Sequence, residues 1–142
     1  MQLIPYGDLS PSLLTELKRL LAYAVGKPDE QRLSRLLGET YSQPSRRLLA
    51  LTDGSQIVGV VGFERTGESS AILMHIAVAP PYRRKGLGRR LVEHLTAAEG
   101  FARLEAETDD DAAEFYRQCR FEVVCLGEKY PGVVRYHCTW SK

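Results

Sequence analysis

Cysteine is scarce in this chain and follows no metal-binding pattern. Its three cysteines, Cys119, Cys125 and Cys138, are odd in number and show no CxxC spacing. This argues against a disulfide framework and against a zinc site, both of which need paired cysteines. We expect free thiols that behave as small buried side chains, a cytoplasmic protein, and no metal.

Long apolar runs and an excess of charge are missing as well. No segment approaches the roughly 18 to 20 apolar residues of a membrane span, and the first ten residues lack the pattern of a signal peptide. Lys plus Arg number 19 against 18 for Asp plus Glu, so the net charge is only +1 and any anion site must be local. We therefore expect neither a membrane nor a nucleic acid as a partner.

The length sets the domain organisation. The chain has 142 residues, enough for one compact domain with a core and too few to divide comfortably into two. No internal repeat, low-complexity stretch or linker interrupts it. We expect one domain over residues 1–142.

The first half of the chain predicts one strand, two helices and a strand pair. Residues 2–6 suit a short strand, and Ser10-Pro11 suits the start of a helix that leucines continue until Gly26-Lys27-Pro28. Further leucines mark a second helix running towards Tyr41. Residues 47–52 and 56–65, separated by Asp53-Gly54, suit two strands joined by a hairpin turn.

The second half begins with an apolar run, residues 71–78, that predicts a buried central strand. A leucine-spaced helix follows until Gly100, then an alternating strand over residues 103–108. Residues 109–119 suit a helix with acidic residues in its first turn, and residues 121–126 and 133–140 suit two closing strands. The order is therefore strand, two helices, three strands, helix, strand, helix, two strands, which favours a mixed sheet covered by helices.

The segment YRRKGLGRRL, residues 82–91, lies between the apolar strand and a helix. Unpaired backbone N–H groups and the helix dipole favour an anion at such a place. Gly86 and Gly88 allow positive φ values and keep side chains away from a phosphate, with Arg83, Arg84 and Lys85 adding positive charge. The pattern lacks the Lys-Ser or Lys-Thr of a nucleotide-triphosphate loop and the third glycine of a dinucleotide fingerprint. A tight turn with solvated arginines explains the glycines alone equally well.

In its context, this segment resembles the acetyl-CoA-binding segment of the GNAT acetyltransferase superfamily. The family pattern is Arg or Gln, two residues, Gly, one residue, then Gly or Ala, which Arg83, Gly86 and Gly88 satisfy. Ala112, Tyr116 and Phe121 match a second family segment at the same spacing. The resemblance implies an α/β fold of the α+β type: a mixed, mostly antiparallel sheet of about seven strands flanked by four helices, in the order β-α-α-β-β-β-α-β-α-β-β.

Two positions depart from the family. Asp109 stands where the family often has an Asn that contacts the pantetheine arm, and an ionised carboxylate cannot donate that hydrogen bond. Arg120 replaces the usual Gly before Phe121, which bears on the end of the helix.

The resemblance also implies an enzyme, an N-acetyltransferase that uses acetyl-CoA and no metal and transfers acetyl directly to a primary amine in a ternary complex. The pyrophosphate of acetyl-CoA would lie on the loop from Arg83 to Gly88, and the backbone around Ala77 would pair with the pantetheine. The implied cofactor-binding residues are Ile76, Ala77, Val78, Arg83, Arg84, Lys85, Gly86, Leu87, Gly88, Arg89, Asp109 and Tyr116.

Tyr116 is the expected general acid, because a phenol can hydrogen-bond or protonate the leaving sulfur. The general base stays open between His75, Glu64 and a water chain. On an unbulged strand His75 points away from the face that carries catalytic side chains in the family. Glu105 and Glu107 could attract a cationic amine, or form the solvent side of their strand.

The acceptor is not identified: small amines, amino acids, aminoglycosides and protein amino termini all stay open. The tyrosines at 41, 82, 130 and 136 could line its pocket. A homodimer is possible, and a non-catalytic acyl-CoA-binding or sensing module of the same fold is the alternative function.

Overall fold

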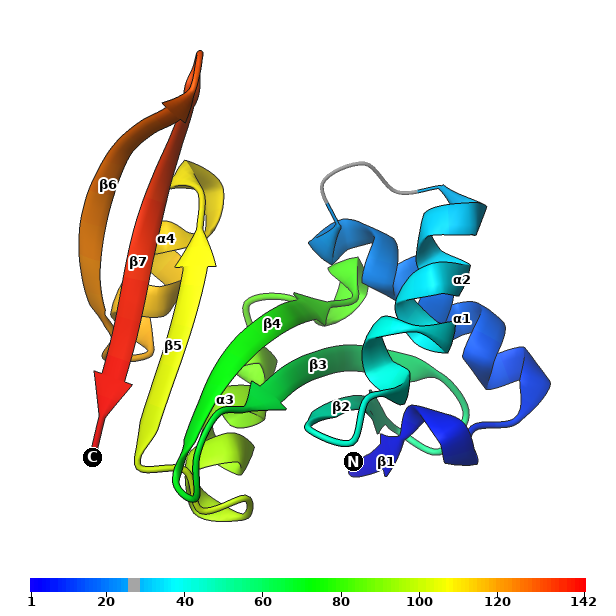
Figure 1. The fold of residues 1–142 in the computed structure, drawn as a ribbon. Helices are drawn as coiled ribbons and strands as arrows, with labels where there is room; N and C mark the ends of the chain where they lie inside the picture. The colour runs from blue at the N-terminus through cyan, green and yellow to red at the C-terminus, as the bar shows by residue number, and fades with distance from the viewer. Residues whose placement is uncertain (26–28) are drawn as a thin grey trace. The chain divides into compact units, whose positions relative to one another are not determined.

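The computed structural model describes residues 1–25 and 29–142, and these form a seven-stranded sheet with strand order β1-β2-β3-β4-β5-β7-β6 and four α-helices (Figure 1). The elements follow one another in the predicted order, and the mixed, mostly antiparallel sheet is confirmed. Gly26, Lys27 and Pro28, expected to end the first helix, lie outside the described residues. No helix among the described residues is long and apolar enough to cross a membrane.

The chain divides into two compact units. The first comprises Met1–Glu64 and Met74–Leu91, and the second comprises Arg65–Leu73 and Val92–Lys142. Strand β4 (Ser70–Val78) and helix α3 (Leu87–Ala97) contribute residues to both units.

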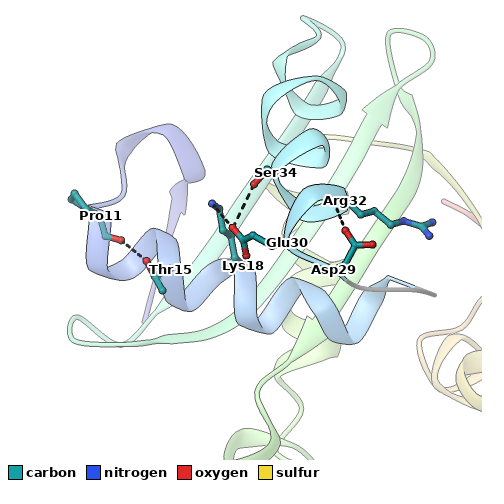
Figure 2. Close-up of polar contacts among 7 residues, drawn as sticks. All are labelled: Pro11, Thr15, Lys18, Asp29, Glu30, Arg32 and Ser34. Atoms are coloured by element: carbon teal, nitrogen blue, oxygen red, sulfur yellow. Dashed lines mark hydrogen bonds and ion pairs between the residues drawn. The ribbon is translucent and has the colours of Figure 1, made fainter.

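The two helices of the first unit begin as the sequence predicts. In α1 (Pro11–Leu21) the Ser10 side chain accepts a hydrogen bond from the backbone N–H of Leu13, and proline occupies the first helical position. In α2 (Glu30–Gly38) the carboxylate of Asp29 accepts from the N–H of Arg32 at 2.7 Å (Figure 2).

The helices α1 and α2 are also joined by side chains. The Lys18 ammonium lies 3.4 Å from the Glu30 carboxylate, which also accepts a hydrogen bond from Ser34 (Figure 2). The Glu30 side chain is 77% exposed and the Lys18 side chain 29% exposed, so this pair is largely screened by solvent and contributes little to stability. Burial of the leucines on the inner faces of the two helices contributes far more.

The core of the first unit lies between these helices and the strands β2 (Arg46–Thr52) and β3 (Ile57–Arg65). These strands pair antiparallel, with Leu48 opposite Gly62 and Ala50 opposite Val60, and β1 (Gln2–Pro5) pairs with β2. The buried cluster consists of Leu17, Leu20, Leu21, Leu33, Leu37, Tyr41, Leu48, Ala50, Ile57 and Val60.

The second unit is built on β5 (Arg103–Thr108), α4 (Asp110–Gln118), β6 (Glu122–Tyr130) and β7 (Val133–Ser141). Strand β5 pairs parallel with Ser70–Ile72 and antiparallel with β7, and α4 lies against β6 and β7. Along β5 the side chains of Leu104, Ala106 and Thr108 are buried, as the predicted alternation requires.

Two predictions in this part of the fold are wrong in detail. The strand expected over residues 121–126 continues to Tyr130, because β-bulges near Leu126 and Lys129, with Gly127 at φ +82°, break the alternation without ending the pairing. Cys119 and Cys138 are buried free thiols, but Cys125 is exposed on β6, so the expected burial fails there.

The apolar run of β4 is the third difference. Ala71 and Leu73 are buried, but Ile72 is 37% exposed and residues 74–78 are only half-buried. A strand that is central in the sheet order thus keeps accessible surface over its second half.

Arg120 preserves the helix end that a glycine would make. Its φ is +69°, the left-handed conformation typical of the residue after a helix, and the N–H of Phe121 donates to the carbonyl of Tyr116 at 3.0 Å. The replacement of glycine therefore leaves the geometry unchanged and adds backbone strain, since a left-handed non-glycine residue costs about 1 kcal/mol.

We predict that Arg120→Gly raises the free energy of unfolding by about 1 kcal/mol, because the strain disappears and the Arg120 side chain is exposed. The midpoint temperature of thermal unfolding would rise by roughly 3 °C. The control is Arg117→Gly, which places the same change in the helical part of α4 and should destabilise by a similar amount. Equal effects of the two variants would contradict the assignment of strain to Arg120.

Candidate functional site

The turn from β4 into α3 has the geometry of an anion-binding loop. A 3₁₀ turn, η4 (Pro80–Tyr82), follows the strand, and its first residues are fixed by the bond from Ala79 N–H to the Val58 carbonyl at 2.9 Å. The first backbone bond of α3 runs from Arg90 to the Gly86 carbonyl at 3.1 Å. The amides of Leu87 and Gly88 therefore precede the hydrogen-bond ladder of the helix and lie at the positive end of its dipole.

The predicted role of the two glycines is half right. Gly86 has φ +76°, and a β-carbon there would meet no atom within 4 Å, so the loop is open at this residue. Gly88 instead lies within α3, whose helical φ any residue adopts, so the positive φ that a glycine allows is not used at Gly88. The second left-handed residue is Arg84, with φ +64°, which the glycine pattern did not indicate.

The exposed side chain of Arg83 contacts the end of β4 and braces the loop. Its Nε donates to the Val78 carbonyl at 2.9 Å, and its guanidinium lies 5.0 Å from the centre of the Tyr23 ring, within cation–π range. Arg84 and Lys85 are exposed, Leu87 is buried and Arg89 is exposed in the first turn of α3. The basic residues of the motif thus divide into one that holds the loop and others that face solvent.

A polar cluster that the sequence did not predict ties the loop to the turn between β2 and β3. The Tyr82 hydroxyl accepts from Gln56 Nε2 at 2.5 Å and donates to an Asp53 oxygen at 3.3 Å. Backbone N–H groups of Ser55 and Gln56 lower the pKa of Asp53 to about 2. Lys85 Nζ lies 5.8 Å from the Tyr82 ring centre. Tyr82, which we considered for an acceptor pocket, therefore anchors the loop.

The strand residues implied in cofactor binding lie just before this turn. Ile76, Ala77 and Val78 are half-buried, and Ala77 packs against the core of the first unit. The Val78 carbonyl accepts a hydrogen bond from Arg83, which joins the end of β4 to the loop.

Tyr116 belongs to the second unit, on α4. It is 4% exposed, and its ring makes edge contacts with Phe115 and Phe121, both with centroids 5.2 Å apart. Burial raises the pKa of its phenol, and the neighbouring Cys138 and Cys119 add to the effect. Tyr116 therefore keeps its proton at neutral pH.

Asp109 caps the same helix. One oxygen of its carboxylate accepts from the backbone N–H groups of Asp111 at 3.1 Å and Ala112 at 3.2 Å. The predicted acidic first turn of α4 is present in Asp110 and Asp111. A hydrogen-bond acceptor in this position suits helix capping, and Asp caps a helix about as well as the Asn that the family often has here.

The residues considered as bases already have partners. The Nδ1 atom of His75 lies 2.6 Å from the Tyr41 hydroxyl, and the Glu64 carboxylate lies 3.4 Å from Arg46 Nε. Burial, followed by the positive charge of Arg32, lowers the pKa of His75, so the ring is neutral at pH 7.

Glu105 and Glu107 lie on the face of β5 opposite the buried residues, in ion pairs. Glu107 accepts from Lys129 at 2.8 Å and from Arg135 at 3.4 Å, and these bonds lower its carboxyl pKa. Glu105 lies 3.2 Å from Arg103. Their charges are balanced locally, which favours the solvent-side interpretation over attraction of an amine. Among the described residues no group of three or more His, Cys, Asp or Glu side chains could hold a metal.

The chain is similar to known proteins in sequence and in fold. Residues 44–123 match the family model of the acetyltransferase (GNAT) domain. N-alpha-acetyltransferase RimI of Mycobacterium tuberculosis is 34% identical over 95 residues, which are 63% of this chain and only 60% of that relative's length.

Two solved structures show the same fold. An aminoglycoside 6'-N-acetyltransferase complexed with coenzyme A superposes with a TM-score of 0.79 at 19% identity, covering 99% of this chain and 97% of that one. The ribosomal-protein-S18-alanine N-acetyltransferase of Escherichia coli gives 0.73 at 20% identity, covering 99% and 92%. The matched range covers more than half of the chain and includes both the β4–α3 turn and Tyr116, so this chain belongs to the GNAT acetyltransferases.

Proposed function

We propose that this acetyltransferase takes its acetyl group from acetyl-CoA and transfers it to a primary amine by direct attack within a ternary complex. The observation that carries the proposal is the braced turn between β4 and α3, with Gly86 left-handed and open at the start of the helix. The solved relative with bound coenzyme A supports the choice of donor.

The loop suits a pyrophosphate group on three grounds. The amides of Leu87 and Gly88 precede the helical ladder, Gly86 leaves open space above them, and Arg84 and Lys85 are exposed. Arg83 is engaged with Val78, so its contribution is to hold the loop in shape. A preformed loop loses little entropy when the anion binds.

The second half of β4 would align the acyl arm. The half-buried backbone of Ile76 and Val78 offers main-chain groups of the kind that pair with an extended amide chain. A backbone N–H on this strand would stabilise the negative charge that develops on the thioester oxygen. Tyr116 would donate a hydrogen bond to the leaving sulfur as the general acid.

The partners of the two candidate bases, His75 and Glu64, affect which amine is the best acceptor. An ε-amine with a pKa near 10.4 is neutral in about one molecule in 2,500 at pH 7, whereas an α-amine with a pKa near 7.8 is neutral in about one in seven. His75 is hydrogen-bonded to Tyr41 and Glu64 forms an ion pair with Arg46, so a water chain is the proposed route for the proton, and an α-amine needs that route least. The RimI relative is named an N-alpha-acetyltransferase, which agrees with this order of preference.

We further propose that the two units form one acetyltransferase domain over residues 1–142. The family model runs from residue 44 to residue 123 and so draws on both units.

The function is tested by incubating the purified protein with acetyl-CoA and a panel of amines, followed by mass spectrometry of the products. The panel contains peptides with free and blocked amino termini, amino acids, polyamines and aminoglycosides. We expect acetylation of peptides with a free α-amine. Binding of acetyl-CoA with no acetylated product and no hydrolysis would instead indicate the non-catalytic module.

The role of Tyr116 gives a second prediction. Tyr116→Phe removes the hydroxyl and keeps the ring between Phe115 and Phe121, so we expect kcat to fall roughly 10²- to 10⁴-fold with little change in the KM for acetyl-CoA. The control is Tyr136→Phe, which removes a hydroxyl that contacts Asp110 on the same helix. Unchanged turnover of Tyr116→Phe with the acceptor from the panel would remove Tyr116 from the mechanism.

A third prediction concerns the loop between β4 and α3, and Gly100 provides the matched control for Gly86. Gly86 and Gly100 both have φ +76° and open space at the β-carbon position, so Gly→Ala costs each about 1 kcal/mol of stability. Only Gly86→Ala should also raise the KM for acetyl-CoA, by roughly 5- to 10-fold, because the strain shifts the amides at the start of α3. Equal KM values for the two variants would argue against the loop as the pyrophosphate site.

A further inference from the structure

A partly buried polar pair, Tyr41 and His75, lies within the first unit and is not explained by the proposed function alone. Tyr41 sits in the 3₁₀ turn η3 (Thr40–Ser42) and is 4% exposed, and His75 comes from the half-buried part of β4. Their Oη and Nδ1 atoms are 2.6 Å apart, and the rings meet edge to face with centroids 5.7 Å apart. The contact joins the segment after α2 to the strand proposed to align the acyl arm.

The fold reserves space for this contact. A β-carbon at Gly62 would lie 1.9 Å from the Tyr41 hydroxyl oxygen and 2.5 Å from the adjacent ring carbon. Only glycine lets the phenol cross β3 here and reach His75. The Tyr6 hydroxyl donates to the Leu37 carbonyl at 2.9 Å and to the Tyr41 carbonyl at 3.4 Å, which fixes the backbone of this turn.

The direction of the hydrogen bond follows from what each partner can do. Burial raises the pKa of Tyr41, so the phenol keeps its proton. Within residues 1–25 and 29–142, His75 Nδ1 is the acceptor found for that proton, and a buried hydroxyl without an acceptor is costly. A neutral imidazole has one N–H donor and one acceptor nitrogen, so if Nδ1 accepts, Nε2 carries the hydrogen.

We propose that Tyr41 donates its hydroxyl proton to Nδ1 of His75 and holds this histidine as the neutral Nε2–H tautomer, a hydrogen-bond donor and not the general base. Tyr41 is then a positioning residue. The second part of this inference rests on the proposed acetyl transfer; the first part does not. A ring that offers only an N–H is complementary to a carbonyl, hydroxyl or carboxylate oxygen and is unsuited to accept a proton from an ammonium group.

The surroundings of His75 are consistent with a neutral ring. Arg32 on α2 places a positive charge near it, and Tyr41 on η3 is an uncharged phenol. Both the burial and the Arg32 charge disfavour a protonated imidazole. The lowered pKa means that the neutral ring adds to stability above pH 6.5, and that this contribution is lost as the pH falls below 6.5 towards the folded-state pKa.

The test of the tautomer is nitrogen NMR on the full-length protein at pH 7. Two-bond proton–nitrogen correlations identify which imidazole nitrogen carries the hydrogen, and His75→Gln assigns the signal among the three histidines. We expect His75 to be neutral with the hydrogen on Nε2. In Tyr41→Phe we expect the pKa of His75 to rise and the tautomer preference to weaken, while the signals of His94 and His137 stay unchanged. A hydrogen on Nδ1, or a charged ring at pH 7, in the wild-type protein would overturn the assignment whether or not the protein is active.

The role in the reaction is tested separately with the acceptor found in the amine panel. Gln at position 75 can accept from Tyr41 through its oxygen and offer an N–H through its nitrogen, as the proposed tautomer does. We expect His75→Gln to keep kcat within about threefold of wild type and to leave the acidic limb of the kcat/KM profile in place. A loss of roughly 10²-fold or more, with that limb abolished, would show that His75 is the base.

Discussion

The turn from β4 into α3 is the constraint on which the proposed donor site depends. The chain must leave the strand, keep the amides of Leu87 and Gly88 free for a ligand, and begin a helix at once. It does so with two left-handed residues, Arg84 and Gly86, and with the bond from Arg83 to the end of the strand. Arg84 bears strain in this conformation, and such strain persists only where the surroundings hold it. The Arg83 brace and the Tyr82 cluster supply that support, which makes the loop rigid before a ligand arrives.

The order of the elements could be predicted because local signals specify it. Helix starts at Ser10 and Asp109 follow from capping chemistry, and the change from a helical to a two-residue period near Arg47 marks the first strand pair. These signals span a few residues and are visible without a partner. They fail at Gly127, where a bulge interrupts the alternation but the backbone bonds of β6 continue.

The contacts that define the candidate site could not be predicted in the same way. Tyr41 and His75 are 34 residues apart in the sequence, and Tyr82 and Asp53 are 29 apart. No periodicity specifies which side chains meet at such distances. The one local trace is Gly62, a glycine inside a buried strand, which indicates that another group approaches the backbone closely. The motif predicts a loop between β4 and α3. Which of its basic residues braces that loop depends on contacts with residues outside the motif.

The burial of Tyr116 limits what its phenol can do in the proposed reaction. Its pKa is raised above 10, whereas a free thiol has a pKa near 8.5, so complete transfer of the phenol proton to a departing thiolate is uphill. A hydrogen bond to the sulfur carries no such cost, and it strengthens as negative charge accumulates in surroundings of low dielectric. The attacking amine becomes cationic as the bond to carbon forms and must lose a proton, so the proton that the thiolate finally takes can come from the amine through water. In the proposed reaction Tyr116 would therefore donate a hydrogen bond to the sulfur while the bond breaks and would keep its own proton, so the general-acid role proposed for it reduces to hydrogen-bond donation.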